Sequence, residues 1–328
     1  MSISLIDIEE LMPKKIIQND FFGEEEVRLK NRMFSGTHER RHMERDEMAS
    51  DYLAQATKNI CERLNLNAAQ DIDMILTNVS VPDESFTGCG AVINKKINGN
   101  AKWIFDLHNT GCVSFLYLID LAHTYMQAKG AKSAIICTAQ TAGGRIFGQE
   151  DTRQMAQAAI PGDGFAVAYV VNSEERPFIA LEFKNFPQHS EDMFGNFKGR
   201  KWWESRESSG SIDFNEDKAA LITARGNKAV PAMILKACES VKIKSTEIDF
   251  LITNQPNTTF LRNWREAVQL PKEKHLDTFD RYANLFGAGI PVTLSEALKA
   301  GKIKKGDLLC LAGFSHACDY SGAGLIRW

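Results

Sequence analysis

Short apolar runs alternate along the chain with longer stretches whose apolar side chains recur at helical spacing. Residues 45–64 and 230–241 have the helical pattern, whereas the runs MILTN at 74–78 and FLITN at 250–254 are brief. Further strand-like runs occupy residues 102–107, 133–139, 164–172, 178–183 and 308–312. This alternation predicts a sheet with parallel strands covered by helices. We expect the strands at 164–172 and 178–183 to be consecutive and to close the first half.

The same pattern occurs twice in the chain. Residues 71–78 read DIDMILTN and residues 247–254 read EIDFLITN, and the two segments are separated by a little over half the chain length. A second pair, SAIICTA at 133–139 and DLLCLAG at 307–313, follows in the same order. Two related halves indicate gene duplication, because a solenoid would have a much shorter period. The sequence therefore predicts an N-terminal half at 1–172 and a C-terminal half at 173–328.

Residues 187–215 interrupt the second half. The segment is rich in charged residues, Ser and Gly, and it contains the adjacent Trp202 and Trp203. Long connections of this kind run over the surface and often carry function. A lid or entrance to a site and an ordinary variable loop fit this composition equally well.

Composition narrows the class of protein. The 328 residues are 44% hydrophobic and 25% charged, which suits one large globular domain or two of average size. A formal net charge of −3 gives no reason to expect a nucleic acid or an anionic membrane as a partner. The acidic residues in MSISLIDIEELMPKK argue against a signal peptide, and the apolar stretch at 112–122 is too short to cross a bilayer. Seven cysteines without CxxC spacing are expected to be reduced thiols in a cytoplasmic protein, and no ligand set for a metal is present.

One cysteine has a setting that suits chemistry. Cys112 lies where a strand passes through a turn of small residues into a long apolar helix. Unpaired backbone N–H groups and the helix dipole at such a position stabilise a thiolate, so we expect the pKa of Cys112 to be lowered. Gly111 before it permits a tight turn. A packed core cysteine before an apolar helix would give the same local pattern.

Several segments spread over nearly the whole chain resemble the β-ketoacyl-acyl-carrier-protein synthase III family of the thiolase fold. The passage from Phe105 to Cys112 is similar to the strand and turn that carry the family's acylated cysteine. The other matching segments are GTHERR at 36–41, Glu84-Ser85-Phe86, Gly162-Asp163-Gly164, Arg225-Gly226-Asn227, Tyr282-Ala283-Asn284, Ile290-Pro291-Val292 and GAGLIRW at 322–328. The resemblance implies a five-layered αβαβα core made of two duplicated βαβ-rich halves, which agrees with the internal repeat.

The resemblance also implies a two-stage covalent mechanism. Cys112 would accept an acyl group from a thioester, and a second substrate would then attack the acyl-enzyme. Asn284 corresponds to the family's asparagine, which stabilises an enolate. Phe86 falls in the segment that reaches into the acyl tunnel of the partner in a dimer. No bound cofactor is implied, because the acyl thioester of carrier-protein phosphopantetheine or of coenzyme A is itself the substrate.

The chain departs from the family at the catalytic histidine. The family's HQxN motif reads here Asn254-Gln255-Pro256-Asn257, and an asparagine donates hydrogen bonds but does not act as a base near neutral pH. Two readings of Asn254 are open: a site residue, or a residue that holds a strand end, like Asn78 in the first half. Among the seven histidines, His316 is the best candidate base, because it lies in the turn that resembles the family's oxyanion-hole turn. Cys318 in the same turn is a weaker candidate.

The region that corresponds to the family's coenzyme A-binding tryptophan and arginine, residues 30–34, supplies neither residue at the matching position. This favours an acyl carrier protein as the donor, and Lys198, Arg200 and Lys201 fit either a contact with that acidic partner or ordinary solvated charge. We expect an acyltransferase or condensing enzyme of specialised metabolism, acting on polyketide or fatty-acid-derived substrates. The alternative is a catalytically altered subunit that supports an active homologue. We expect a dimer, either a homodimer or a heterodimer with a homologue.

Overall fold

Two five-stranded sheets dominate the computed structural model, which describes residues 2–23, 36–108, 110–202, 204, 210–214 and 216–328. The first sheet has the order β1-β7-β6-β4-β5, with β1 (Ile3–Leu11), β7 (Gly164–Asn172), β6 (Ser133–Gln140), β4 (Met74–Val79) and β5 (Trp103–Asp106). The second has the order β8-β14-β13-β11-β12, with β8 (Phe178–Asn185), β14 (Tyr320–Arg327), β13 (Leu308–Ser315), β11 (Phe250–Thr253) and β12 (His275–Leu276). In each sheet the three strands at one side are parallel and the other two pairings are antiparallel.

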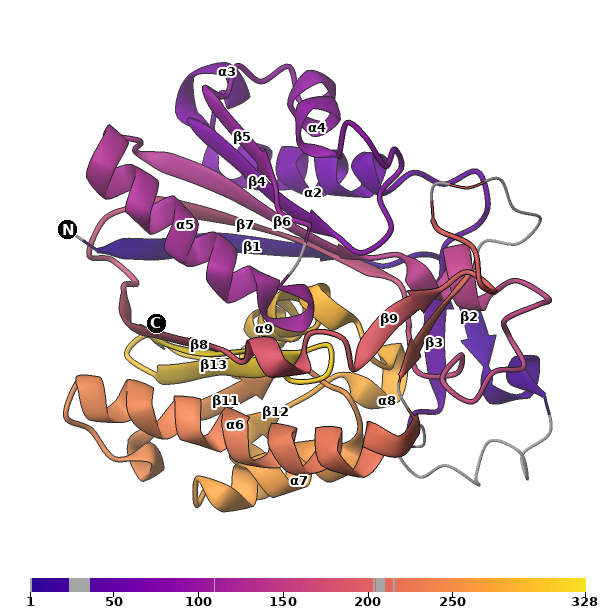
Figure 1. Cartoon of the computed structure of the whole chain (residues 1–328). Coiled ribbons are helices and arrows are strands. Elements are labelled where there is room, and N and C mark those ends of the chain that lie inside the picture. The colour runs from indigo at the N-terminus through magenta and orange to yellow at the C-terminus, as the bar shows by residue number, and fades with distance from the viewer. Residues whose placement is uncertain (1, 24–35, 109, 203, 205–209, 215) are drawn as a thin grey trace.

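The sheets and helices form five layers (Figure 1). Helices α2 (Ala49–Leu64) and α4 (Gly90–Lys96) cover the outer face of the first sheet, and α6 (Ala219–Ser240) and α7 (Thr258–Ala267) cover the outer face of the second. Helices α5 (Ser114–Lys129) and α9 (Gly289–Lys299) lie between the sheets. Short helices α3 (Ala68–Asp71) and α8 (Phe279–Tyr282) complete the connections. The five-layered αβαβα core expected from the resemblance is confirmed.

The duplication is visible in the strand order. Strands β1, β4, β5, β6 and β7 of the first sheet occupy the same positions as β8, β11, β12, β13 and β14 of the second. The repeated segments identified in the sequence therefore form equivalent strands. One prediction is wrong: residues 178–183 do not close the first half, because β8 pairs antiparallel with β14 and belongs to the second sheet.

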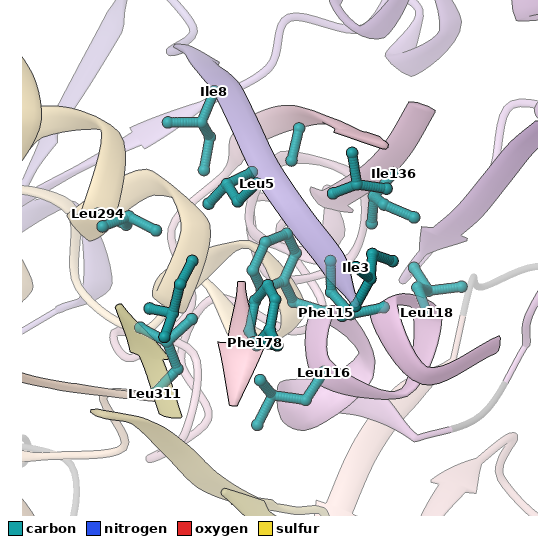
Figure 2. Close-up of a cluster of buried hydrophobic side chains, with 14 of the residues drawn as sticks. Ile3, Leu5, Ile8, Phe115, Leu116, Leu118, Ile136, Phe178, Leu294 and Leu311 are labelled. Carbon is teal, nitrogen blue, oxygen red and sulfur yellow. The ribbon is translucent and has the colours of Figure 1, made fainter. Parts of the chain in front are cut away.

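The central layer contains the largest apolar cluster (Figure 2). Phe115, Leu116 and Leu118 on α5 meet side chains from both sheets and from α9. The labelled partners in Figure 2 are Ile3, Leu5, Ile8, Ile136, Phe178, Leu294 and Leu311. Complete burial of such a side chain stabilises the fold by about 1.5–3 kcal/mol. Contact with both sheets explains why the first turns of α5 are almost entirely apolar, whereas the polar residues Asp120, His123 and Gln127 lie further along the helix, where it is less buried.

Helix boundaries differ from the sequence prediction at two N-termini. Helix α2 begins at Ala49 rather than at residue 45, because the Asp83 carboxylate accepts hydrogen bonds from the backbone N–H groups of Ala49 and Ser50. Helix α6 begins at Ala219 rather than at residue 230, although it contains Gly226 and Pro231, which both disfavour helix. A Cβ atom at Gly226 would lie 2.8 Å from the rings of Phe260 and Phe314, so close packing explains this glycine.

The segment 187–215 folds partly into a hairpin of β9 (Met193–Asn196) and β10 (Ser211–Phe214). Beside it lies a second hairpin of β2 (Lys15–Gln18) and β3 (Glu39–His42) (Figure 1). Gln157 anchors β10, because its side-chain amide donates to the carbonyl of Ile212 at 3.1 Å and to the carboxylate of Asp213 at 2.8 Å. Asp192 anchors the start of β9 through an ion pair of 2.5 Å with Arg225 on α6. The hairpin is thus fastened to both halves of the molecule.

Across the described residues, no helix is both long enough and apolar enough to cross a membrane.

Candidate active site

A cavity of about 380 Å³ lies where the connections from both halves meet the β9–β10 hairpin. Cys112, Asn254, Asn284 and His316 all line it, so the structure brings the four predicted site residues together. The other polar lining residues are Asn78, Ser80, His108, Gln157 and Asn257, and among the described residues no acid, lysine or arginine contributes to the lining. Most of the wall is apolar and largely aromatic, with Phe147, Ile160, Met193, Phe194, Ile212, Phe214, Ile222, Phe260, Phe286 and Phe314. The cavity therefore suits an uncharged, apolar group.

Cys112 lies in a single 3₁₀ turn (Gly111–Val113) that leads directly into α5. Gly111 has a φ of +40° and Thr110 a φ of +69°, so the chain reverses sharply at this point. The Ser315 hydroxyl holds the turn, because it donates to the Thr110 carbonyl and accepts from the Val113 N–H at 3.0 Å. The position of the thiol is therefore fixed by the end of β13 as well as by α5.

The resting thiol is not an acidic one. Burial raises the pKa of Cys112 to about 12, and the negative charge of Asp319 acts in the same direction. The Asn254 side chain and the backbone N–H groups of Cys112 and His316 point at the sulfur and lower the pKa by less than burial raises it. The prediction that the start of the helix lowers the pKa of this thiol is wrong, because desolvation outweighs the helix dipole. A nucleophile at this position needs a base.

Asn254 follows β11 and is almost completely buried. Its Oδ1 accepts from the Phe314 N–H at 3.2 Å and its Nδ2 donates to the Phe314 carbonyl at 3.1 Å, which fixes the orientation of the amide. The side chain also donates towards the Cys112 sulfur. Both roles considered from the sequence therefore have a structural counterpart: Asn254 holds the neighbouring strand, and it touches the thiol.

Asn284 precedes α9, so it occupies the connection of the second half that corresponds to the Cys112 connection of the first. Its Oδ1 accepts from the Phe286 N–H at 3.0 Å. Because a backbone N–H can only donate, the opposite end of the amide must be Nδ2, a donor. Gly287 packs tightly beside it, since a Cβ atom there would lie 2.9 Å from the Gly111 carbonyl.

His316 begins the four-residue turn between β13 and β14. Its Nδ1 lies 3.1 and 3.2 Å from the two carboxylate oxygens of Asp319, and its backbone φ is +49°. Its other ring nitrogen, Nε2, would lie only 2.8 Å from a Cβ atom built on Gly111. The imidazole therefore extends from a buried carboxylate to the turn that carries Cys112.

Other residues singled out in the sequence lie elsewhere. Phe86 is 85% exposed, is near Trp202 and does not line the cavity of its own chain. Cys318 is buried in the core beside α6. His108, by contrast, also lines the cavity, where it is exposed. Trp203 and residues 30–34 are outside the described residues.

Comparisons with known proteins agree with this architecture. The family model for the C-terminal part of 3-oxoacyl-[acyl-carrier-protein (ACP)] synthase III matches residues 238–328, and the family model for 3-oxoacyl-[ACP] synthase III matches residues 105–185. Together they match more than half of the chain. Two duplicated α/β halves with a cysteine at the start of a buried helix define the class of thiolase-fold acyltransferases. Within that class, the chain belongs to the 3-oxoacyl-acyl-carrier-protein synthase III-like family, as the sequence motifs predict.

Individual relatives cover the whole length. The chain is 26% identical to the β-ketoacyl-[acyl-carrier-protein] synthase III of Clostridium perfringens, with 96% of each chain covered. It is 28% identical to that of Desulfotalea psychrophila, with complete coverage of both. Its fold is similar to the crystal structure of 3-oxoacyl-[acyl-carrier-protein] synthase III from Aquifex aeolicus, with a TM-score of 0.84, 21% identity, and 99% and 100% of the two chains covered. It is also similar to Xanthomonas campestris OleA with bound lauric acid and lauroyl-CoA, with a TM-score of 0.84, 15% identity, and 100% and 99% covered.

Sequence reasoning missed three parts of the site. Asp319 stands three residues after His316 in a strand-to-strand turn, and that spacing was a usable signal. Ser315 gives no signal, because its role depends on contacts with a segment about two hundred residues earlier. The aromatic side chains of the β9–β10 hairpin were also not assigned, since the composition of 187–215 fitted a lid or entrance and an ordinary loop equally well.

Proposed function

We propose that this protein loads an acyl group from a thioester onto Cys112 and transfers it to a second substrate, with His316 as the general base. The observation that carries the proposal is the convergence of Cys112, His316, Asn254 and Asn284 on one uncharged, largely aromatic cavity. A thiol whose pKa is raised by burial needs a proton acceptor, and His316 approaches the Cys112 turn through Nε2.

In the loading step the Cys112 thiol gives its proton to His316 Nε2 while the sulfur attacks the thioester carbonyl. The backbone N–H groups of Cys112 and His316, which point at the sulfur in the resting site, are the nearest donors for the resulting oxyanion. The carbonyl then re-forms, the bond to the donor's sulfur breaks, and the leaving thiolate takes the proton from His316. The products are the Cys112 thioester and the free thiol of a carrier protein or of coenzyme A.

We further propose that the acceptor loses a proton rather than carbon dioxide when it attacks. Decarboxylation of a malonyl group needs donors for the enolate, whereas the Asn254 amide is already directed to the Phe314 carbonyl and to the Cys112 sulfur. Asn284 Nδ2 alone would remain for that task. A base beside the acyl-enzyme instead suits an amine, an alcohol or an acidic C–H group, and this chemistry fits specialised metabolism better than initiation of fatty acid synthesis.

Intact-protein mass spectrometry tests the loading step. The protein is incubated with a panel of acyl-carrier-protein and acyl-coenzyme A thioesters of increasing chain length, and each adduct is measured. We expect an adduct that Cys112→Ala abolishes and that Cys61→Ala, which changes a partly buried cysteine on α2, leaves intact. A panel without any adduct on the wild-type chain would refute the proposal and would favour a supporting subunit in a heterodimer.

A dimer is part of the proposal. Phe86 is 85% exposed in the single chain, which is unusual for a phenylalanine, and its segment resembles the one that enters the partner's tunnel in the family. Analytical ultracentrifugation of the wild-type chain and of Phe86→Ser distinguishes a dimer that uses this residue from a monomer. A monomeric wild-type chain at micromolar concentration would remove this part of the proposal.

A further inference from the structure

We propose that Asp319 is the positioning residue that makes His316 a general base, so that Asp319, His316 and Cys112 act as one relay. The inference rests on the proposed function, because it concerns the loading of Cys112. It assigns a role to a buried carboxylate that no sequence motif indicated.

The geometry of the turn supports the relay. Asp319 has a side-chain exposure of only 7%, and both of its carboxylate oxygens lie within 3.2 Å of His316 Nδ1. A carboxylate can only accept, so Nδ1 carries the proton and, in the neutral ring, Nε2 carries the lone pair. Nε2 is the nitrogen that faces Gly111 and the Cys112 turn. Asp319 thus selects the tautomer that can remove the thiol proton.

The surrounding contacts keep the relay in place. The Tyr320 N–H donates to Asp319 Oδ1 at 3.1 Å, and the Tyr320 ring packs edge-on against the imidazole. Ser315 ties the same turn to Thr110 and Val113 on either side of the cysteine. Asp319 and Tyr320 are titratable neighbours of the imidazole on its own hairpin, Cys112 lies on the facing turn, and the charge of Asp319 also acts on Tyr117 of α5 and on Cys318.

The relay and a purely electrostatic role of Asp319 predict opposite changes in the reactivity of Cys112 when Asp319 is neutralised. The negative charge of Asp319 raises the pKa of the Cys112 thiol. If Asp319 acted on Cys112 through its charge alone, its neutralisation would make the thiol more acidic and more reactive. A relay predicts the opposite, because an asparagine that donates to Nδ1 forces the proton onto Nε2, where it blocks removal of the thiol proton.

The experiment measures the rate of Cys112 alkylation by iodoacetamide between pH 6 and pH 10 for the wild type and Asp319→Asn, with adducts located by mass spectrometry. In the wild type we expect the rate profile to have an inflection due to the base that assists the thiol. In Asp319→Asn we expect that inflection to disappear and the rate at pH 7.5 to fall by about 100-fold. The matched control is Asp307→Asn, at the opposite end of β13, which should leave the profile unchanged. A rate that is unchanged or higher in Asp319→Asn would overturn the relay.

Two further variants separate the relay from a structural effect. Asp319→Glu keeps the carboxylate and should recover at least part of the lost rate if the variant's melting temperature matches that of Asp319→Asn. In a His316→Ala background, Asp319→Asn should cause no further decrease, because the residue acts through the imidazole. A further decrease in that background would contradict the inference. Alkylation does not depend on the acyl donor, so a wild-type protein that is alkylated as expected but never acylated would refute the proposed function and leave the relay standing.

Discussion

Gly111 is the position at which a single methyl group should separate binding from chemistry. Its backbone has a φ of +40°, and a Cβ atom would meet His316 Nε2 at 2.8 Å and His316 Cδ2 at 3.2 Å. The third contact, with the Cβ atom of Ser315, would be 3.3 Å. Since a contact under 3 Å cannot persist, Gly111→Ala must move the imidazole, the Cys112 turn, or both.

Two effects contribute to the expected magnitude. Placing an alanine in the left-handed region costs about 1 kcal/mol. Relieving the contact with the partly exposed His316 ring costs less than overpacking a rigid core does. Together the two effects should lower the free energy of unfolding by about 1–3 kcal/mol. The effect on chemistry should be larger. A displacement of about 1 Å between reacting groups lowers rates by about 100-fold. The contact at Nε2 alone requires a shift of about 0.6 Å to go from 2.8 Å to an ordinary separation of 3.4 Å, and the strained turn can add to it.

The assay is single-turnover acylation of Cys112, followed by quenching and mass spectrometry at several donor concentrations. We expect the maximal rate of acylation to fall about 100-fold while the donor concentration that gives half of this rate stays nearly constant, because the apolar side chains that form most of the cavity wall are unchanged. Gly130→Ala is the matched control. Gly130 has a φ of +72°, yet a Cβ atom there would meet no atom within 4 Å, so this variant has the same backbone strain without the contact.

The two variants should have similar melting temperatures and very different acylation rates. If Gly111→Ala is folded and acylates as fast as the wild type, Nε2 is not the group that activates the thiol. If Gly130→Ala loses acylation equally, the loss follows from backbone strain, and the reasoning from the His316 contact is wrong.

Three further predictions concern other parts of the molecule. Asn254→Asp removes the donor to the Cys112 sulfur and one hydrogen bond to the neighbouring strand. The rate of acylation should therefore fall at least about 10-fold, and the free energy of unfolding should fall by about 2–4 kcal/mol. An unaltered acylation rate in a variant of matched stability would contradict this role of Asn254. Burial lowers the pKa of His42 to about 3 and that of His275 to about 4. Below pH 6.5 the unfolded chain therefore binds more protons at these residues than the folded chain does. Each histidine should lower the free energy of unfolding by about 2 kcal/mol between pH 8 and pH 5. Urea unfolding at pH 8 and pH 5 should show that His42→Gln loses less free energy of unfolding between these pH values than the wild type does. An equal loss in the two proteins would refute the lowered pKa of His42. Asp192→Asn removes the ion pair that holds the β9–β10 hairpin to α6. Steady-state kinetics should then show a higher KM for the acyl donor with little change in kcat. A selective loss of kcat would argue against a role of this hairpin at the entrance to the cavity.

The fold could be predicted from the sequence because the same pattern of strand and helix segments occurs in both halves of the chain. The runs at 74–78 and 250–254 occupy equivalent places in the two sheets, so each half supports the reading of the other. The errors lie where distant residues decide local structure. Asp83 sets the start of α2 from outside the helix, and Gly226 is tolerated within α6 because two aromatic rings pack against it. Neither contact can be predicted from the spacing of apolar residues along the local sequence.

Four of the residues predicted for the site line one cavity, whereas the prediction for the pKa of the thiol was wrong. Cys112 and His316 could be selected from their positions at a helix start and in a hairpin turn, and both line the cavity. The pKa of the thiol could not be predicted, because it depends on how completely the two halves exclude water from the sulfur. The same reasoning explains Asn254, whose bonds to the backbone of Phe314 exist only once β11 and β13 are paired.

Strand order shows how the base proposed on the β13–β14 turn could serve in place of a residue that follows β11, the position where the sequence resembles the family's histidine motif. The ends of β11 and β13 are adjacent in the parallel part of the second sheet, so a side chain that follows either strand can face the Cys112 turn. Asn254 occupies the first of these positions and stabilises the second, because it holds the backbone of Phe314 two residues before His316. A histidine at position 254 would lack that pair of backbone bonds, so restoring the family residue alone should loosen the turn that now carries the base. We therefore expect the amide at position 254 and the base proposed at position 316 to be coupled features of one site.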